Sequence, residues 1–220
     1  MFIGHFGLGF AVKKASRKPS LGTTFFAAQF IDLLWPFFLF FGIEKVSVDP
    51  GNTAFTPLNF ISYPYSHSLV AVLVWSLLFG GIYYIIKKDR KRAFLLALLV
   101  VSHWLLDLVV HRPDLPLSLS EETKLGFGLW NSKVLTIVVE MLIFSGGVML
   151  YSTNTKAKNK TGTYSLWGLV VFFLLIYGMN LFGDPPPNTE AIGYVGLAQW
   201  LFILWGYWID ANRSTANDHL

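Results

Sequence analysis

The chain has 220 residues, of which 54% are hydrophobic, 17% aromatic and only 14% charged, with a formal net charge of +4. A water-soluble domain of this size needs more charge on its surface, so the composition indicates an integral membrane protein. Cysteine is absent, which excludes disulfides and thiolate metal sites.

The apolar segment at residues 1–12 is too short to cross a bilayer. Twelve helical residues reach about 18 Å, roughly half of the hydrocarbon thickness. The segment is therefore either an interfacial helix or a half-helix that rises towards the midplane and carries His5 with it. Its basic residues follow the apolar run, the wrong order for a cleavable signal peptide, so we expect Met1 to be retained.

Six later segments are long enough to span, at about 20 apolar residues per crossing. They cover residues 23–43, 67–87, 91–111, 132–151, 164–183 and 191–210. The loops between them alternate between rich and poor in Lys and Arg, and the positive-inside rule then places both termini in the cytoplasm. We interpret the basic residues as orientation signals, and we expect no nucleic-acid partner.

The predicted fold class is an all-α, polytopic membrane helical bundle with six transmembrane helices and a short N-terminal half-helix. It forms one integral membrane domain. Within it, residues 1–151 would hold the chemistry, and residues 152–220 would add two transmembrane helices and a short cytoplasmic tail that begins after Asp210.

Three acidic residues, Asp32, Asp107 and Glu140, lie inside predicted spans, whereas no Lys or Arg does. An unpaired charge in hydrocarbon costs several kcal/mol or more, so these carboxyls are either protonated or neutralised by another positive charge. A bound divalent cation is the economical candidate, because histidines accompany the acids.

His103, Asp107 and His111 are four residues apart and are predicted to share one helix face. The carboxylate between the two imidazoles could bridge metals on either side. Any one of these residues alone could equally serve packing or a proton relay. The candidate metal ligands are His5, Asp32, His67, His103, Asp107, His111 and Glu140.

The order of these residues resembles that of the membrane-bound metal-dependent hydrolases, some of which are described as LexA-binding inner-membrane-associated hydrolases. It is also similar to the ligand order of zinc-dependent phospholipase C and S1–P1 nuclease, which are soluble, all-helical, trinuclear zinc enzymes that cleave phosphate esters. The resemblance covers about residues 1–145. It implies one metal held by Asp32, His67, His103 and Asp107, a second held by His5 with Asp107 as the bridge, and a contribution of His111 to a third.

The sequence departs from that pattern in two places. Met1 and Phe2 precede the first histidine, whereas the soluble enzymes use the amino group of a processed N-terminal residue as a ligand. Thr136 occupies the histidine position of a second His-x3-acid pair, in which Glu140 stands in the acidic place. One or two metal ions are therefore expected rather than three.

Imidazole and carboxylate ligands suit Zn²⁺, with Mn²⁺ or Fe²⁺ as alternatives. A metal-bound water has its pKa lowered to about 7 and can attack as hydroxide. Asp107 is expected to orient that hydroxide. Arg112 is expected either to bind a phosphate oxygen or to snorkel at the interface.

The leading hypothesis is a phosphoesterase embedded in the membrane lipid. Its substrate would also be a lipid, either a phospholipid or a lipid-linked phosphate. The phosphoester comes from the resemblance alone. The alternative is a metal-ion or proton transporter using the same His/Asp/Glu cluster, although the sequence reveals none of the paired broken helices typical of carriers. A scaffold with a purely structural metal is a third option.

Overall fold

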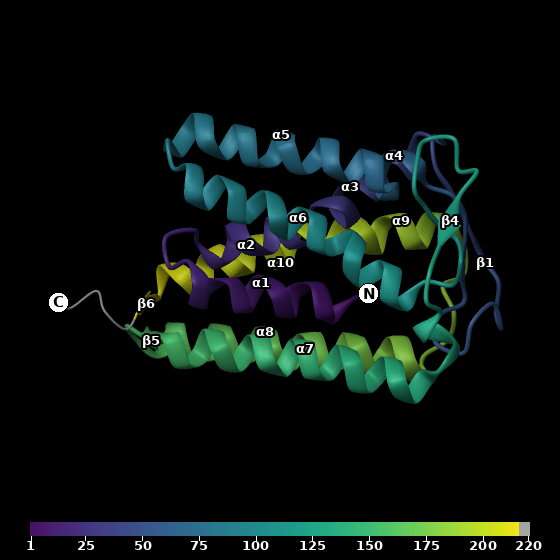
Figure 1. Ribbon diagram of the computed structural model, residues 1–220. Coiled ribbons are helices and arrows are strands. Elements are labelled where there is room, and N and C mark those ends of the chain that lie inside the picture. The colour runs from purple at the N-terminus through teal and green to yellow at the C-terminus, as the bar shows by residue number, and fades with distance from the viewer. Residues whose placement is uncertain (216–220) are drawn as a thin grey trace.

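The structure is a computed structural model that describes residues 1–215, and it is an all-α helical bundle with three short two-stranded sheets (Figure 1). The helices are α1 (Ile3–Ala15), α2 (Leu21–Ala28), α3 (Phe30–Phe40), α4 (Pro64–His67), α5 (Leu69–Lys87), α6 (Arg90–Val110), α7 (Lys133–Asn154), α8 (Lys160–Phe182), α9 (Thr189–Ala198) and α10 (Trp200–Ala211). Three antiparallel strand pairs join β1 (Lys45–Val48) to β2 (Leu58–Ser62), β3 (Leu115–Pro116) to β4 (Lys124–Leu125), and β5 (Thr155–Ala157) to β6 (Arg213–Thr215).

Five stretches are long and apolar enough to cross a membrane within the described residues. They are α5, α6, α7, α8 and the combined stretch α9–α10, and the bent pair α2–α3 makes a sixth if it is counted as one span. The expected all-α membrane bundle is confirmed by this arrangement.

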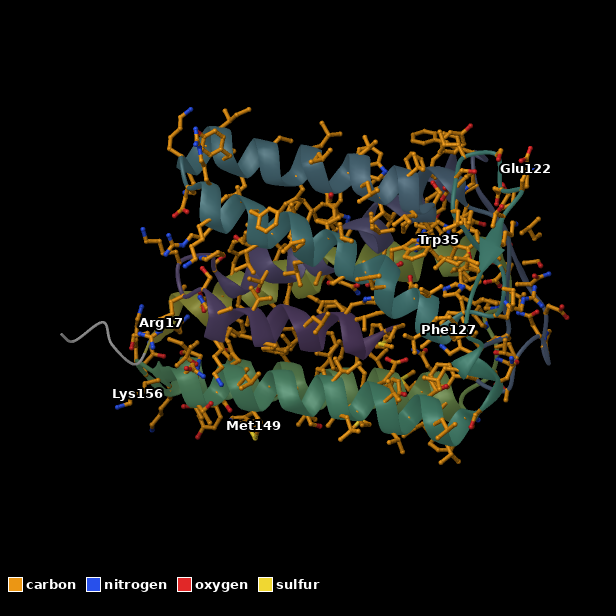
Figure 2. All side chains as sticks on the ribbon, in the orientation of Figure 1. Arg17, Trp35, Glu122, Phe127, Met149 and Lys156 are labelled. Atoms are coloured by element: carbon orange, nitrogen blue, oxygen red, sulfur yellow. The ribbon has the colours of Figure 1, made fainter. Side chains whose placement is uncertain are left out.

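The two ends of the bundle differ in charge. One end, called the basic end here, carries Arg17, the turn at residues 87–92 and the stretch 156–160. The opposite end, called the loop end, carries the β1–β2 and β3–β4 hairpins. Figure 2 shows Arg17 and Lys156 at the basic end and Glu122 and Phe127 at the loop end.

Two of the predicted continuous spans are broken, at Gln29 between α2 and α3 and at Gln199 between α9 and α10. The first break bends its helix pair by 55°. The two breaks face one another, because the Gln29 Nε2 donates to the Gln199 Oε1 at 2.7 Å. Only the first break bends its helix pair sharply, because α9 and α10 together still form one candidate span, Thr189–Ala211. Within the described residues the sequence analysis thus missed one bent span. Mean hydropathy measures the length of an apolar stretch and does not register a single-residue turn inside it.

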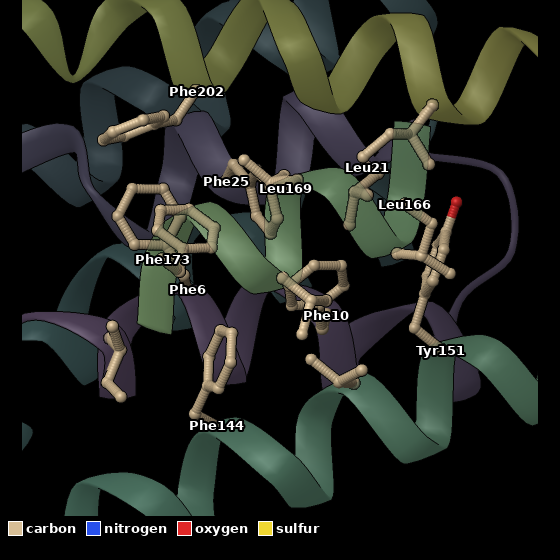
Figure 3. Packing of buried hydrophobic residues seen from close by; sticks show 14 of the residues in the cluster. Phe6, Phe10, Leu21, Phe25, Phe144, Tyr151, Leu166, Leu169, Phe173 and Phe202 are labelled. Carbon is tan, nitrogen blue, oxygen red and sulfur yellow. The ribbon is translucent and has the colours of Figure 1, made fainter. Parts of the chain in front are cut away.

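Helix α1 lies inside the bundle and not along its surface (Figure 1). The side chains of Phe6 and Phe10 are fully buried, and the Phe6 ring packs at 4.4 Å from Phe173 and 5.1 Å from Phe25. Figure 3 shows this aromatic core around α1, with residues from α2, α7, α8 and α10. Of the two possibilities for residues 1–12, the buried half-helix is therefore the one that forms.

The predicted tail after Asp210 is ordered for its first few residues. Arg213 lies in β6 and is buried, and its guanidinium donates to the Thr155 carbonyl at 3.0 Å and to the Gly162 carbonyl at 2.9 Å. These hydrogen bonds and the pairing with β5 hold the chain against α7 and α8 at the basic end. The rest of the predicted tail, residues 216–220, lies outside the described residues.

Candidate metal centre

Helix α6 supplies the middle of the site. His103 and Asp107 lie one turn apart on its buried face, with 0% and 2% of their surfaces exposed. The His103 Nε2 is 3.2 Å from the Asp107 Oδ2. Their spacing of four residues brings both side chains to the same side of the helix, as the sequence predicts.

Helix α1 brings its N-terminal end to the same carboxylate. The His5 Nε2 is 3.2 Å from the Asp107 Oδ1, and the His5 ring stacks on the His103 ring with centroids 3.8 Å apart. The Met1 amino group lies 2.6 Å from the same Oδ1. Asp107 therefore faces an amino group as well as two imidazoles, which agrees with the expectation that a buried carboxylate without Lys or Arg is neutralised by another positive charge or by a proton.

Helices α3 and α4 complete the cluster. The Asp32 Oδ1 is 3.3 Å from the His67 Nε2 and 3.5 Å from the His103 Nε2. The sequence predicts that His67 opens the second span, but in the structure it ends the short helix α4. The long helix α5 begins only at Leu69, after Ser68, whose side chain caps α5 by accepting from the Ala71 amide. The turn between the two helices directs the His67 ring into the bundle.

These side chains form two overlapping groups that could hold a metal ion. One comprises His5, His103 and Asp107, and the other comprises Asp32, His67 and His103; in each group the candidate ligand atoms lie within 4.8 Å of one another. His103 belongs to both. Five predicted ligands from four helices therefore converge.

The hydrogen bonds around the cluster fit a cation. His103 donates from Nδ1 to the Ala28 carbonyl, the last residue of α2, at 2.8 Å, whereas its buried Nε2 has no hydrogen-bond partner. The His5 Nδ1 is also buried without a partner. Buried polar atoms are normally satisfied, so the unpartnered His103 Nε2 beside the Asp32 and Asp107 carboxylates is the arrangement expected around a ligated ion, whereas the His5 Nδ1 is not the nitrogen that faces Asp107.

Asp32 is the member of the cluster that reaches the outside. Its side chain is 22% exposed, compared with at most 4% for His5, His67, His103 and Asp107. The site is therefore closed towards α1 and α6 and open beside α3.

His111 lies apart from both metal-ligand groups. Helix α6 ends at Val110, so His111 lies just beyond the helix with an extended backbone (φ −62°, ψ 145°) and does not continue its helical face. Its Nδ1 lies 2.9 Å from the Asp114 Oδ1, and its ring packs 4.3 Å from Trp130. Burial lowers the pKa of the His111 imidazole. Of the expected ladder, His103 and Asp107 belong to the two groups that could hold a metal ion, and the role of His111 at a further metal stays a prediction.

Arg112 also lies in the loop end. Its Nε donates to Asp114 at 3.0 Å and one terminal nitrogen donates to the Asn59 side chain at 2.6 Å. Tyr63 completes this network by donating to Asp114 at 3.3 Å. Burial and the Asp114 carboxylate raise the pKa of the Tyr63 phenol well above its usual range.

Glu140 is fully buried and faces the start of α1. Its Oε2 accepts from the backbone amides of Phe2 at 3.0 Å and Gly4 at 3.3 Å, while its Oε1 has no partner. Four amides at the start of an α-helix lack internal partners, and Glu140 satisfies two amides at this end. Thr136, one turn earlier, donates to the Leu129 and Ser132 carbonyls within its own segment.

Two polar residues next to the cluster are absent from the predicted set. Glu44 and Ser66 are 2% and 0% exposed; the Ser66 hydroxyl donates to Glu44 and also forms a hydrogen bond with the His67 Nδ1. Burial raises the pKa of the Glu44 carboxyl. Only the position of Ser66 beside His67 could have indicated this contact in the sequence, because Glu44 lies 22 residues earlier in a loop.

Comparison with protein-family models, with curated proteins and with solved structures finds no match to this chain. The case for the site therefore depends on its geometry. Buried imidazoles and carboxylates from α1, α3, α4 and α6 meet inside a helical bundle whose spans are long enough to cross a membrane, and they could hold a metal ion.

Proposed function

We propose that the protein is a membrane-embedded, metal-dependent hydrolase, a phosphoesterase that acts on a phospholipid or a lipid-linked phosphate. One observation carries the metal: the His103 imidazole already donates from Nδ1 to a backbone carbonyl, and its Nε2 faces the Asp32 and Asp107 carboxylates without a hydrogen bond. A neutral ring in this position directs a lone pair at carboxylate oxygens, which is repulsive unless a positive charge lies between them.

A divalent cation accounts for more of the cluster than a proton does. A proton on one Nε2 satisfies one nitrogen, whereas a cation accepts lone pairs from several imidazoles and carboxylates at once. Zn²⁺ is the cation we expect, with Mn²⁺ or Fe²⁺ as alternatives, because all the donors are nitrogen or oxygen.

Each residue of the site has a role that follows from its position. A bound divalent cation would supply Lewis acidity and lower the pKa of water. Asp107 directs Oδ1 to His5 and Oδ2 to His103, so it can hold both sides of the cluster together. Asp32 lines the exposed side, where water and substrate would enter. Arg112, held by Asp114 and Asn59, is the group we assign to a phosphate oxygen.

The lipid substrate and the orientation are parts of the same proposal. The exposed residues of the long helices are mostly apolar, which suits lateral approach of a lipid. We place the basic end in the cytoplasm of a bacterial inner membrane by the positive-inside rule, so that the loop end faces outwards. The phosphoester is supported by the resemblance in ligand order, which is an argument by analogy.

The first experiment measures metal content. Protein purified in detergent is analysed for metals as wild type, His103→Ala and Asp107→Ala. We expect one or two equivalents of a divalent metal in wild type, and a loss of at least one equivalent in each variant. Asp89→Ser is the matched control on α6, because serine still accepts from the Arg92 amide and Asp89 lies at the far end of the helix.

Equal metal content in wild type, His103→Ala and Asp107→Ala would refute the metal centre, provided that the variants elute as folded protein.

The second experiment measures hydrolysis, as phosphate or head group released from phospholipids and from lipid-linked phosphates. We expect release by wild type and by Asp89→Ser, its loss on metal removal, and none by His103→Ala.

One observation favours the alternative, a metal-ion or proton transporter. Carriers often bind their substrates at discontinuous helices near the bilayer midplane, and the α2–α3 pair is bent by 55° at Gln29, which contacts Gln199 in the α9–α10 span. Metal or proton flux in proteoliposomes, together with metal that exchanges readily from the purified protein, would support transport. A retained stoichiometric metal without flux would support hydrolysis.

A further inference from the structure

Glu44 is a buried acid in the loop between α3 and β1, and it faces three hydrogen-bond donors. Its Oε1 accepts from the Tyr65 and Ser66 amides, each at 2.8 Å. Its Oε2 accepts from the Ser66 hydroxyl at 2.6 Å. Within residues 1–215 it forms no ion pair with Lys or Arg, so its placement is set by these donors.

The Ser66 hydroxyl connects this carboxylate to the metal centre. The Ser66 Oγ lies 2.6 Å from the His67 Nδ1. A hydroxyl carries one proton and can donate it only once. If Ser66 donates to Glu44, the imidazole must be the donor in the second hydrogen bond, so Nδ1 carries its proton and Nε2 is a bare acceptor. That Nε2 lies 3.3 Å from the Asp32 Oδ1 and 3.9 Å from the Asp107 Oδ2.

A different partner holds His103 in the same orientation as His67, with Nδ1 protonated and Nε2 towards the carboxylates. Its Nδ1 faces the Ala28 carbonyl, which can only accept, so this ring also carries its proton on Nδ1. Two imidazoles from separate helices therefore present Nε2 to the same pair of carboxylates. Outer hydrogen bonds of this kind fix the tautomer and the ring orientation of metal-ligating histidines.

We propose that Glu44 and Ser66 are positioning residues of the metal centre, which act through a carboxylate–hydroxyl–imidazole chain to hold the His67 ring with Nδ1–H towards Ser66 and Nε2 towards the ion. This inference deepens the proposed function, since its consequence for metal affinity depends on the metal centre. The orientation of the His67 ring does not depend on a bound ion and can be measured separately.

The test uses Glu44→Gln, Ser66→Ala and Ser66→Thr. Glu121→Gln is the matched control, because Glu121 also lies at the loop end and accepts from a serine hydroxyl, that of Ser62, but contacts no histidine in the described structure. The ring tautomer of His67 is read from nitrogen NMR spectra of metal-free, histidine-labelled protein in detergent, with the His67 signal assigned by its loss in His67→Gln.

We expect the Nδ1–H tautomer of His67 in wild type, Ser66→Thr and Glu121→Gln, and a mixture of tautomers in Ser66→Ala. Zn²⁺ affinity is expected to fall about 10- to 100-fold in Glu44→Gln and Ser66→Ala, the range typical of such outer hydrogen bonds. It should be unchanged in Ser66→Thr and Glu121→Gln. Should Glu44→Gln fail to fold, the comparison of Ser66→Ala with Ser66→Thr still decides the question.

Failure of this inference is distinguishable from failure of the metal centre. A Nε2–H tautomer of His67 in wild type, or unchanged tautomer and Zn²⁺ affinity in Ser66→Ala, overturns the positioning role and leaves the metal centre in place. The metal centre is refuted if the wild-type protein binds no metal. If the Nδ1–H tautomer of His67 is nevertheless present in wild type and lost in Ser66→Ala, the hydrogen-bond chain is supported.

Discussion

At the scale of single residues, the three buried acids meet three different environments. Asp107 contacts the Met1 amino group and two imidazoles, and Asp32 faces two imidazoles and the outside. Glu140 instead accepts from backbone amides at the start of α1. Their common position inside an apolar run therefore does not imply a common role. Glu140 contacts α1 as a capping residue does, and its predicted role as a ligand stays a prediction.

The capping role of Glu140 leads to a test by two substitutions. Glu140→Gln keeps an oxygen that can accept from the Phe2 and Gly4 amides, so we expect retained metal content and nearly unchanged thermal stability. Glu140→Leu leaves these buried amides without a partner, which costs about 1–3 kcal/mol for each unsatisfied group, and we expect a lower unfolding temperature. Loss of a metal equivalent in Glu140→Gln would instead identify Glu140 as a ligand.

At the scale of elements, the position of α1 decides whether His5 reaches the site. Helix α1 approaches α7 closely because glycines face each other: a Cβ added at Gly147 would lie 2.0 Å from the Gly7 carbonyl oxygen, and one at Gly7 would lie 2.7 Å from the Ile143 carbonyl oxygen. Small residues allow helix backbones to approach in this way inside membranes. The α1–α7 contact is therefore as much a part of the site as the ligands are.

Neighbouring glycines on α7 provide a matched pair for testing that contact. Gly147→Ala places a methyl group against the α1 backbone, so we expect destabilisation of about 1–3 kcal/mol, the usual range for overpacking, and weaker metal binding through displacement of His5. Gly146→Ala meets no atom within 4 Å and should be neutral or slightly stabilising, since alanine favours a helix more than glycine does. Thermal unfolding in detergent and metal affinity measure both effects. Equal behaviour of the two variants would contradict the close-packing argument.

At the scale of the whole molecule, charge and function are separated along the long axis of the bundle. Arg17 and Lys156 mark the basic end, and Glu122 and Phe127 lie with the hairpins at the loop end (Figures 1 and 2). The proposed orientation places the basic end in the cytoplasm, which the positive-inside rule favours. In that orientation, we expect substrate to enter beside Asp32 from the membrane or from outside the cell.

The absence of native cysteine makes this orientation directly measurable. Single cysteines are introduced as Glu122→Cys at the loop end and Lys156→Cys at the basic end, both at exposed positions. With a membrane-impermeant maleimide, we expect labelling of Glu122→Cys in intact spheroplasts and of Lys156→Cys only after permeabilisation. The reverse pattern would invert the proposed topology, and the cysteine-free chain serves as the unlabelled control.

The sequence by itself determined the class of protein, the approximate spans and most of the candidate ligands. Apolar length and charge alternation are properties of contiguous residues, so they can be read directly and they predict an all-α membrane bundle. Ionisable residues are rare in such spans, and this rarity singled out His5, Asp32, His103 and Asp107 without any knowledge of their neighbours.

Only the tertiary structure decided which of those residues meet. It ended α6 before His111, placed Glu140 against the start of α1, and connected Glu44 to His67 through Ser66. It also introduced the breaks at Gln29 and Gln199, of which the first lies beside the Ala28 carbonyl that orients His103. These outcomes depend on a helix end, a one-residue turn and hydrogen bonds between segments far apart in the chain, and none of them leaves a periodic signal in the local sequence.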